Sequence, residues 1–338
     1  MRKIFKIALF AVIALVVLLS IAISVSIGWR PFIGPRARAL TNRTFERTPQ
    51  RLVRGQYLAN NLGCFECHGE HEWTKHDAPL IEGTRGAGYS SGIPLAGLPG
   101  HVVPPNITPD PDTGAGRWTD DMLARAIREG IGHDGAALFP FMPYPDMRNM
   151  SDEDLASVVV YLRSIPPIRK ALPKTQIIFP VNYLIRSAPQ PITETVPEPD
   201  LSTPVKRGQY LVTIAGCTDC HTPQKNGQPI RGLDFAGGFI LEGPWGRLAS
   251  VNITPDPSGI SYYDEAMFLD MMHTGYVKAR KINQIMPWED FRGLTDEDLK
   301  GIYAYLRTLK PVKHRVDNSE PPTFCKLCGA SHGAGNQN

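Results

Sequence analysis

The chain has 338 residues, 42% of them hydrophobic, and a formal net charge of +3. This length leaves room for two domains of ordinary size, and the nearly balanced charge argues against a nucleic-acid partner. The 31 glycines and 31 prolines exceed average usage, which predicts short helices separated by long, turn-rich loops.

An apolar segment lies at the start of the chain. Residues Ile7 to Trp29 carry no charge and follow three basic residues, Arg2, Lys3 and Lys6. About 20 apolar residues span a bilayer, whereas the core of a signal peptide has roughly 7–15. We therefore expect residues 1–30 to form an uncleaved membrane anchor. Cleavage as a signal peptide is the alternative. Basic residues on both sides of the segment leave its orientation open.

The rest of the chain contains an internal repeat. Five blocks recur in the same order: Arg54–Leu58 with Arg207–Leu211, Cys64–His68 with Cys217–His221, Asn106–Pro111 with Asn252–Pro257, Phe141–Pro143 with Ile285–Pro287, and Ser151–Leu155 with Thr295–Leu299. This order predicts two homologous domains, 49–168 and 203–313. A proline-rich linker over 169–202 joins them, and a tail over 314–338 follows.

Each copy is predicted to be mainly helical. A first helix is expected over Pro49–Leu62 and over Thr203–Ala215, ending at the glycine before the cysteines. Residues Trp118–Arg128 have the pattern of a middle helix. The last helix should begin at a capping box, at Ser151 or Thr295, and stop before a proline. The expected fold class is therefore mainly α, with two tandem repeated domains after one transmembrane helix.

Each copy carries one Cys-x-x-Cys-His motif. Two cysteines at this spacing can form thioethers to both vinyl groups of a haem, and the next histidine then lies beneath the iron. We therefore predict two covalently bound haem c groups. The predicted residues are Cys64, Cys67, Cys217 and Cys220 for attachment, and His68 and His221 as proximal ligands. A disulfide or half of a zinc site is the alternative, but zinc needs four ligands and the spare histidines do not repeat.

The sixth position of each iron needs a ligand from farther along the chain. Met142 and Met286 lie 74 and 65 residues after the motif histidines, and each precedes a proline and the last helix. A thioether sulfur is soft and raises the potential of the haem. We predict that these two methionines are the distal ligands. The alternatives are that they are core residues, that another residue of the first domain takes the place, or that ligation is bis-histidine. The competing residues are Met147, Met150, His133 and His273.

Two further features concern the surroundings of the haem. A backbone carbonyl near Pro223 could accept the ring N–H of His221 and fix its tautomer. The first motif has Gly69-Glu70 at that place, so its acceptor must differ. The repeated segments that begin at Asn106 and Asn252 either line the haem edge or form a plain Asx turn before proline.

Two cysteines remain, Cys325 and Cys328, in the tail. His332 follows the second of them by four residues and could not easily lie beneath a third haem. We expect a disulfide, because haem attachment takes place outside the cytoplasm, in an oxidising compartment where disulfides form. A small metal site with His332 is the alternative.

At these motifs the sequence resembles the dihaem members of the cytochrome c family. This resemblance implies a mainly α fold with two tandem class I cytochrome c-like domains after the N-terminal transmembrane helix. It is also similar to the cytochrome subunits of membrane-bound alcohol and gluconate dehydrogenases. The resemblance covers about residues 49–313 and is most specific at the haem motifs, the Asn-Ile-Thr-Pro-Asp blocks and the Met-Pro sites. It implies the attachment and ligand roles given above. It also implies that the chain relays electrons between a dehydrogenase or quinol-oxidising partner and a terminal acceptor such as an oxidase.

The sequence thus favours an electron carrier over an enzyme. With a methionine for each iron, no open position is left for a substrate, whereas a dihaem peroxidase or a thiosulfate-oxidising cytochrome needs one. A haem-free zinc or disulfide scaffold is the third interpretation. Because haem is joined to reduced thiols outside the cytoplasm, we expect the haem domains in the periplasm. The single N-terminal helix would hold them at the inner membrane.

Overall fold

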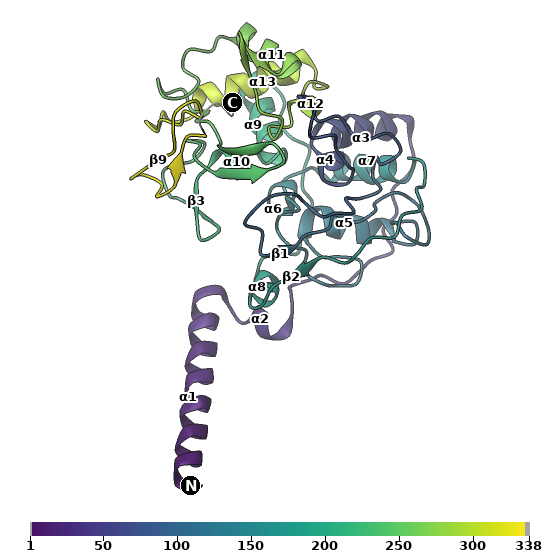
Figure 1. The fold of residues 1–338 in the computed structure, drawn as a ribbon. Helices are drawn as coiled ribbons and strands as arrows, with labels where there is room; N and C mark the ends of the chain where they lie inside the picture. The colour runs from purple at the N-terminus through teal and green to yellow at the C-terminus, as the bar shows by residue number, and fades with distance from the viewer. Residues whose placement is uncertain (1, 335–338) are drawn as a thin grey trace.

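The structure is a computed structural model that describes residues 2–334. One long helix, α1 (Arg2–Ile27), projects from two helical domains that lie beside each other (Figure 1). Helix α1 is apolar, and none of its residues is buried within the chain. Its 26 residues span about 39 Å, more than the roughly 30 Å of a bilayer's hydrocarbon core. Helix α1 is therefore long and apolar enough to cross a membrane.

The segment after α1 connects it closely to the first domain. A short helix, α2 (Arg30–Ile33), comes first, and an arm over residues 34–48 then runs along the domain. Arg38 in this arm pairs with the fully buried Asp121 at 2.7 Å and with Glu129 at 2.8 Å, both on helix α5 (Asp120–Glu129). Buried ion pairs of this kind hold the arm in place, because either partner alone would be an uncompensated charge.

Two packed helices form the centre of each domain. In the first domain α3 (Pro49–Asn61) packs along α7 (Asp152–Leu162), and in the second α9 (Pro204–Ile214) packs along α13 (Asp296–Thr308). A Cβ at Gly55 would collide with the backbone of Ser157, and a Cβ at Gly208 would collide with the backbone of Gly301. The repeated Arg-Gly-Gln-Tyr-Leu block therefore needs its glycine for close helix packing. The observed bounds agree closely with the predicted first and last helices.

The remaining elements are short. The other helices are α4 (Cys64–Cys67), α5 (Asp120–Glu129) and α6 (Tyr144–Met147) in the first domain, and α10 (Cys217–His221), α11 (Glu265–Thr274) and α12 (Trp288–Phe291) in the second. The strands are β1 (Gly100–His101), β2 (Gln176–Ile177), β3 (Gln224–Lys225), β4 (Gln228–Pro229), β5 (Ile240–Gly243), β6 (Gly246–Ala249), β7 (Tyr276–Val277), β8 (Arg280–Lys281), β9 (Thr323–Phe324) and β10 (Ser331–His332). Within residues 2–334 they form two-stranded antiparallel sheets, in each of which one strand pairs with the next.

The segment between the domains is more structured than an extended linker. It contains strand β2, helix α8 (Val181–Leu184) and the 3₁₀ helix η1 (Ile185–Ser187). Strand β2 pairs with β1 of the first domain, and α8 and η1 contact α2. The mainly helical fold class with two repeated domains is confirmed.

Two equivalent tyrosines join the domains. The Tyr57 hydroxyl of α3 donates to Asp298 of α13 at 2.5 Å. The Tyr210 hydroxyl of α9 donates to Asp154 of α7 at 2.7 Å. Both carboxylates lie in the first turn of a last helix, so each domain supplies a hydrogen bond to the helix start of the other. The tyrosine of the repeated block is therefore an interface residue.

Carboxyl pairs lie at the same interface. Glu66 of α4 and Asp290 of α12 come together beside Gly63. Burial raises the pKa of both carboxyls. Repulsion from Glu289 also raises the pKa of Glu66, and repulsion from Glu66 also raises the pKa of Asp290.

A second carboxyl pair lies on the reciprocal side of the interface, where Asp146 of α6 and Asp219 of α10 come together beside Gly216. Each cysteine motif thus carries an acid that meets an acid of the other domain.

The tyrosine contacts predict a measurable coupling between the domains. We expect Tyr57→Phe to lower the free energy of unfolding by about 1–2 kcal/mol, because Asp298 loses one of its hydrogen-bond donors and the Thr295 N–H loses its acceptor. Guanidinium titration of the detergent-solubilised protein measures this. The matched control is Tyr276→Phe, which keeps its ring against His76. Equal losses in the two variants would contradict the proposed coupling.

The carboxyl pair predicts a stability that depends on pH. The native state keeps protons on Glu66 and Asp290 at pH values where the unfolded chain has lost them. Their contribution is therefore most favourable at acidic pH and falls as the pH rises through the raised pKa values. We expect Asp290→Asn to gain about 1–2 kcal/mol over the unmodified protein at about pH 8 and nothing at about pH 4. An equal gain from the exposed control Asp270→Asn would refute this explanation.

Candidate haem sites

Each Cys-x-x-Cys-His motif forms a single helical turn directly after the first helix of its domain. Gly63 and Gly216 precede the two motifs, and both have a positive φ, of 76° and 64°. This left-handed conformation ends one helix and starts the next, and glycine adopts it without strain. Positions i and i+3 of a helical turn lie on the same face. The turn therefore presents both cysteines of a motif to one side.

The four motif cysteines are free of disulfides in the structure. Cys64, Cys67 and Cys217 are partly buried, and Cys220 is exposed. Within residues 2–334, neither motif belongs to a cluster of three or more histidine, cysteine or carboxylate groups close enough to hold a metal ion. The described residues therefore do not offer a zinc site at either motif, whereas free thiols are suited to thioether formation.

The two motif histidines are held in the same way. His68 and His221 are buried, with 8% and 9% of their surface exposed. The Nδ1 of His68 lies 2.7 Å from the carbonyl of Pro105, and the Nδ1 of His221 lies 2.8 Å from the carbonyl of Val251. A carbonyl only accepts, so Nδ1 carries the proton and Nε2 keeps a free electron pair. Burial lowers the pKa of both rings, which favours the neutral form that binds metals.

These carbonyls correct one expectation. The acceptor for His221 is not near Pro223, which follows the motif, but comes from Val251, 30 residues away. The acceptors in the two domains are equivalent, because each immediately precedes the Asn-Ile-Thr-Pro-Asp block. The position of the acceptor is therefore marked by the repeated Asn-Ile-Thr-Pro-Asp block and not by the residues around Pro223.

The repeated asparagines form Asx turns that brace these carbonyls. The Asn106 side-chain oxygen accepts from the Thr108 N–H at 2.9 Å and from its hydroxyl at 2.7 Å. The Asn106 amide donates to the Ile168 carbonyl, after the last helix, at 2.7 Å. The equivalent bonds of Asn252 go to Thr254 and Val312. Of the two expectations for this block, the Asx turn is confirmed.

The methionines predicted as distal ligands occupy matching turns. The Met142 N–H donates to Phe139 and the Met286 N–H donates to Asn283, both at 3.1 Å. Both side chains are partly buried and pack against the core of their own domain. After each Met-Pro pair a buried aromatic residue, Tyr144 or Trp288, begins the next helical turn. The two segments thus share one backbone design.

The competing residues are engaged elsewhere. Met147 and Met150 lie in the first core, with 4% and 2% of their surface exposed. His133 is exposed and stacks on Trp118, with ring centroids 4.4 Å apart. The Nε2 of His273 lies 3.0 Å from a carboxylate oxygen of Asp296. These contacts account for the four side chains without iron.

The residues of each domain therefore fit a covalently attached haem. Each copy supplies a neutral imidazole with a fixed tautomer, two free cysteines on one turn and a partly buried methionine. Such a set of donors suits a c-type haem with histidine and methionine as its ligands.

Comparisons with known proteins agree with this assignment. The family model for cytochrome c matches residues 52–166 and 205–310. A diheme cytochrome c-type protein of Cereibacter sphaeroides is 31% identical, over 77% of this chain and 86% of the relative. The cytochrome c subunit of a quinone alcohol dehydrogenase of Gluconacetobacter polyoxogenes is 29% identical, over 77% of this chain and 56% of the relative. The gluconate 2-dehydrogenase cytochrome c subunit of Pantoea cypripedii is 33% identical, over 76% and 59%.

The chain spans a little over half the length of these two dehydrogenase subunits. The two family matches lie within the two predicted cytochrome domains and include both cysteine motifs. The chain therefore belongs to the cytochrome c family, as a member with two cytochrome c domains and two covalently bound haem c groups.

Proposed function

We propose that the protein is a membrane-anchored dihaem cytochrome that relays electrons between a dehydrogenase or quinol-oxidising partner and a terminal acceptor. Its haem domains lie on the periplasmic side of the inner membrane. One observation carries the relay: both cysteine motifs lie at the interface between the domains, each beside a carboxyl from the other domain. Groups attached at Cys64 and Cys217 therefore lie close to the boundary that an electron must cross.

Within this proposal each motif residue has one role. The cysteines form the thioethers, the motif histidines bind iron from the proximal side, and Met142 and Met286 bind from the distal side. The bound haem supplies a centre that gains and loses one electron reversibly. The histidine bonds to Pro105 and Val251 hold each ring in one orientation, which limits rearrangement between the two redox states.

Two occupied axial positions favour a carrier. A haem enzyme of the peroxidase or thiosulfate-oxidising type needs an open or labile position for its substrate. The methionine candidates occur at matching places in both domains, which leaves neither iron without one. The relatives reported above are described as a cytochrome or as cytochrome subunits of dehydrogenases. These descriptions also support a dehydrogenase as partner.

The base of the structure supports attachment to a membrane. Helices α2 and α8 lie together where α1 leaves the domains (Figure 1), and Arg186 donates to the Pro31 carbonyl at 3.2 Å. Large apolar side chains are exposed in this region: Trp29, Phe32, Ile33, Ile178, Phe179 and Tyr183. Aromatic residues of this kind are favoured at the boundary between lipid and water. They would let the first domain rest on the bilayer surface.

Purification from membranes tests the partner and the anchor together. We expect the full chain to remain in membranes after a carbonate wash and, after detergent extraction, to co-purify with a dehydrogenase whose substrate reduces the haems. Deletion of residues 2–27 behind a cleavable signal should release a soluble protein that keeps both haems, because α1 packs against neither domain. Release of the full chain by the wash would refute the anchor. Haems that no membrane dehydrogenase or quinol reduces would refute the relay.

The distal ligands are tested one at a time. We expect Met286→Ala to make the second haem high-spin and quick to bind cyanide, and to lower its potential by a substantial part of the roughly 0.8 V that axial ligands span. The first haem should keep its spectrum. Met142→Ala should have the converse effect. The matched control is Met267→Ala, a partly buried methionine of the second core. Unchanged potentials in Met286→Ala would remove that residue as a ligand.

A further inference from the structure

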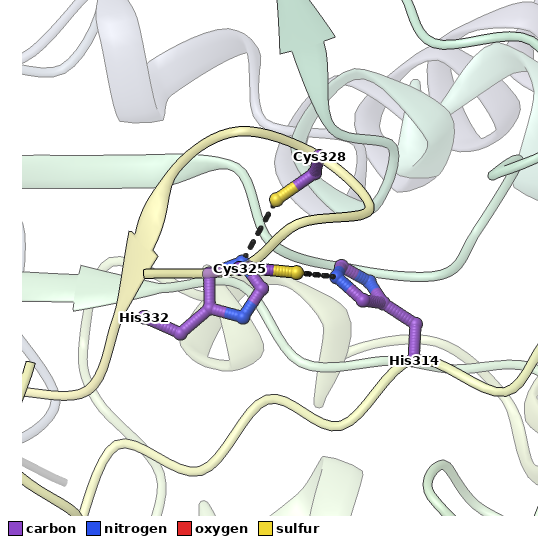
Figure 2. Close-up of side chains that lie close together, drawn as sticks. All are labelled: His314, Cys325, Cys328 and His332. Carbon is purple, nitrogen blue, oxygen red and sulfur yellow. Dashed lines mark hydrogen bonds between the residues drawn. The ribbon is translucent and has the colours of Figure 1, made fainter. Parts of the chain in front are cut away.

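The tail brings together two cysteines and two histidines beside the second domain. In Figure 2 the Cys325 and Cys328 side chains point toward the rings of His314 and His332. One ligand atom from each of the four residues lies within 4.8 Å of all the others. The Cys325 sulfur is 3.3 Å from the His314 Nε2, and the Cys328 sulfur is 3.1 Å from the His332 Nε2. Both cysteines are free, so the disulfide expected from the sequence is not formed.

We propose that this cluster is a structural zinc site of the Cys₂His₂ type. Zinc bonds of about 2.3 Å to sulfur and about 2.0 Å to nitrogen, at tetrahedral angles, separate a sulfur from a nitrogen ligand by roughly 3.5 Å. The two measured sulfur–nitrogen distances are close to this value. Four protein ligands leave no open position, so the site is structural rather than catalytic.

Both histidines present the correct nitrogen. The Nδ1 of His314 lies 2.9 Å from the Ala236 carbonyl, and the Nδ1 of His332 lies 3.3 Å from the Arg315 carbonyl. These carbonyls accept a hydrogen bond from the Nδ1–H, which leaves Nε2 of each ring free to bind a metal and directed at the cluster. A backbone carbonyl behind a ligating histidine is the usual support at zinc sites.

Charge and burial favour zinc over a hard cation. His314 has 1% of its surface exposed, and Cys328 and His332 have 7% each. The ligand set contains no carboxylate, so calcium and magnesium are poorly matched. Two cysteine thiols lose their protons to solvent when they bind, and two thiolates with one Zn²⁺ and two neutral imidazoles sum to zero charge. A neutral cluster suits a buried position.

The chain around the cysteines is shaped for this arrangement. Strands β9 and β10 pair on either side of the turn. The Cys325 N–H donates to Ala330 and the Gly329 N–H donates to Cys325, both at 2.9 Å. Gly329 has a φ of +74°, which closes the turn after the second cysteine. A Cβ on Gly238 would come within 2.7 Å of His314 and 2.9 Å of His332, so only glycine leaves this space.

The first domain shows what the cluster replaces. The residue equivalent to His314 is Lys170, whose ammonium pairs with Glu70 at 2.6 Å and bonds to the Gly88 carbonyl. That ion pair joins the segment after the last helix to the loop after the cysteine motif. The second domain has Pro223 in place of the glutamate and cannot form the pair. The zinc site would provide the corresponding connection there, with the tail as the additional partner.

The connection reaches the second haem site. His314 bonds to Ala236, and the next residue, Gly237, donates its N–H to the His221 carbonyl at 2.7 Å. The tail is also attached through Asn318, which exchanges two hydrogen bonds with Ala249, at 2.8 and 2.9 Å. Zinc would therefore brace the proximal side of the second haem site and leave the first unaffected.

Metal analysis of the full-length, haem-loaded protein tests the proposal. We expect about one zinc per chain, or one zinc for every two haem irons, in protein from zinc-supplemented cells. Cys328→Ser should reduce the zinc to below about a tenth of that value while both haems remain attached. The matched control is Lys326→Ser, in the same turn, which should keep the metal. His332→Gln provides a second ligand variant if Cys328→Ser folds poorly.

Three results would overturn the proposal. The first is that the haem-loaded protein without substitutions contains no zinc and has a mass two hydrogens below that of the form with free thiols. A disulfide would then join Cys325 and Cys328. The second is a stoichiometric amount of another metal, and the third is zinc retained in both ligand variants. Trypsin supplies an independent readout. We expect cleavage after Lys313, Arg315 and Lys326 to be slow in the zinc-loaded protein, faster after chelation, and slow again when zinc is restored.

Discussion

The hydrogen bond from each motif histidine to a distant carbonyl is the contact on which the two sites depend. It fixes the tautomer of His68 and His221 and leaves Nε2 of each ring without a proton, in the form that can bind a metal. The carbonyl is in turn placed by the Asx turn of the following asparagine, and that asparagine bonds to the segment after the last helix. The repeated Asn-Ile-Thr-Pro-Asp block therefore supports the motif histidine, which we propose as the proximal ligand. On the proposed function, the four other blocks serve attachment, distal ligation and helix packing.

The duplication also explains how the two domains fit together. Because the copies are equivalent, one tyrosine hydrogen bond implies a second, and one carboxyl pair implies another on the opposite side. An interface of this type brings both cysteine motifs toward the same boundary. The paired carboxyls destabilise the interface when they are ionised, since burial and mutual repulsion favour their protonated forms. The tyrosine hydrogen bonds stabilise the same interface. Each is donated to a different carboxylate, Asp154 or Asp298, which also pairs with an arginine of its own domain.

Much of this could be read from the sequence, but not all of it. The cysteine motifs, the helix starts and the Met-Pro segments are local patterns, and the structure places them as matching pairs. The acceptors at Pro105 and Val251 are backbone carbonyls, so the identity of these residues does not indicate their role. The prediction of an acceptor near Pro223 is wrong because the carbonyl that bonds to His221 lies 30 residues away. The sequence gives no indication of His314 for a related reason. It follows the last helix without a motif, and its equivalent in the first domain is Lys170, so the repeat conceals it.

The contacts of the arm and the linker hold the first domain, and not the second, next to the membrane helix. The arm ties the first domain to α1 through Arg38, and the linker returns to α2 before it enters the second domain. The tail lies along the outer edge of the second domain, away from the first domain (Figure 1). On the proposed function, a partner embedded in the bilayer would therefore reach the first haem site more readily, and a soluble acceptor the second. A metal that holds the tail on the second domain would keep the outer surface of that domain constant.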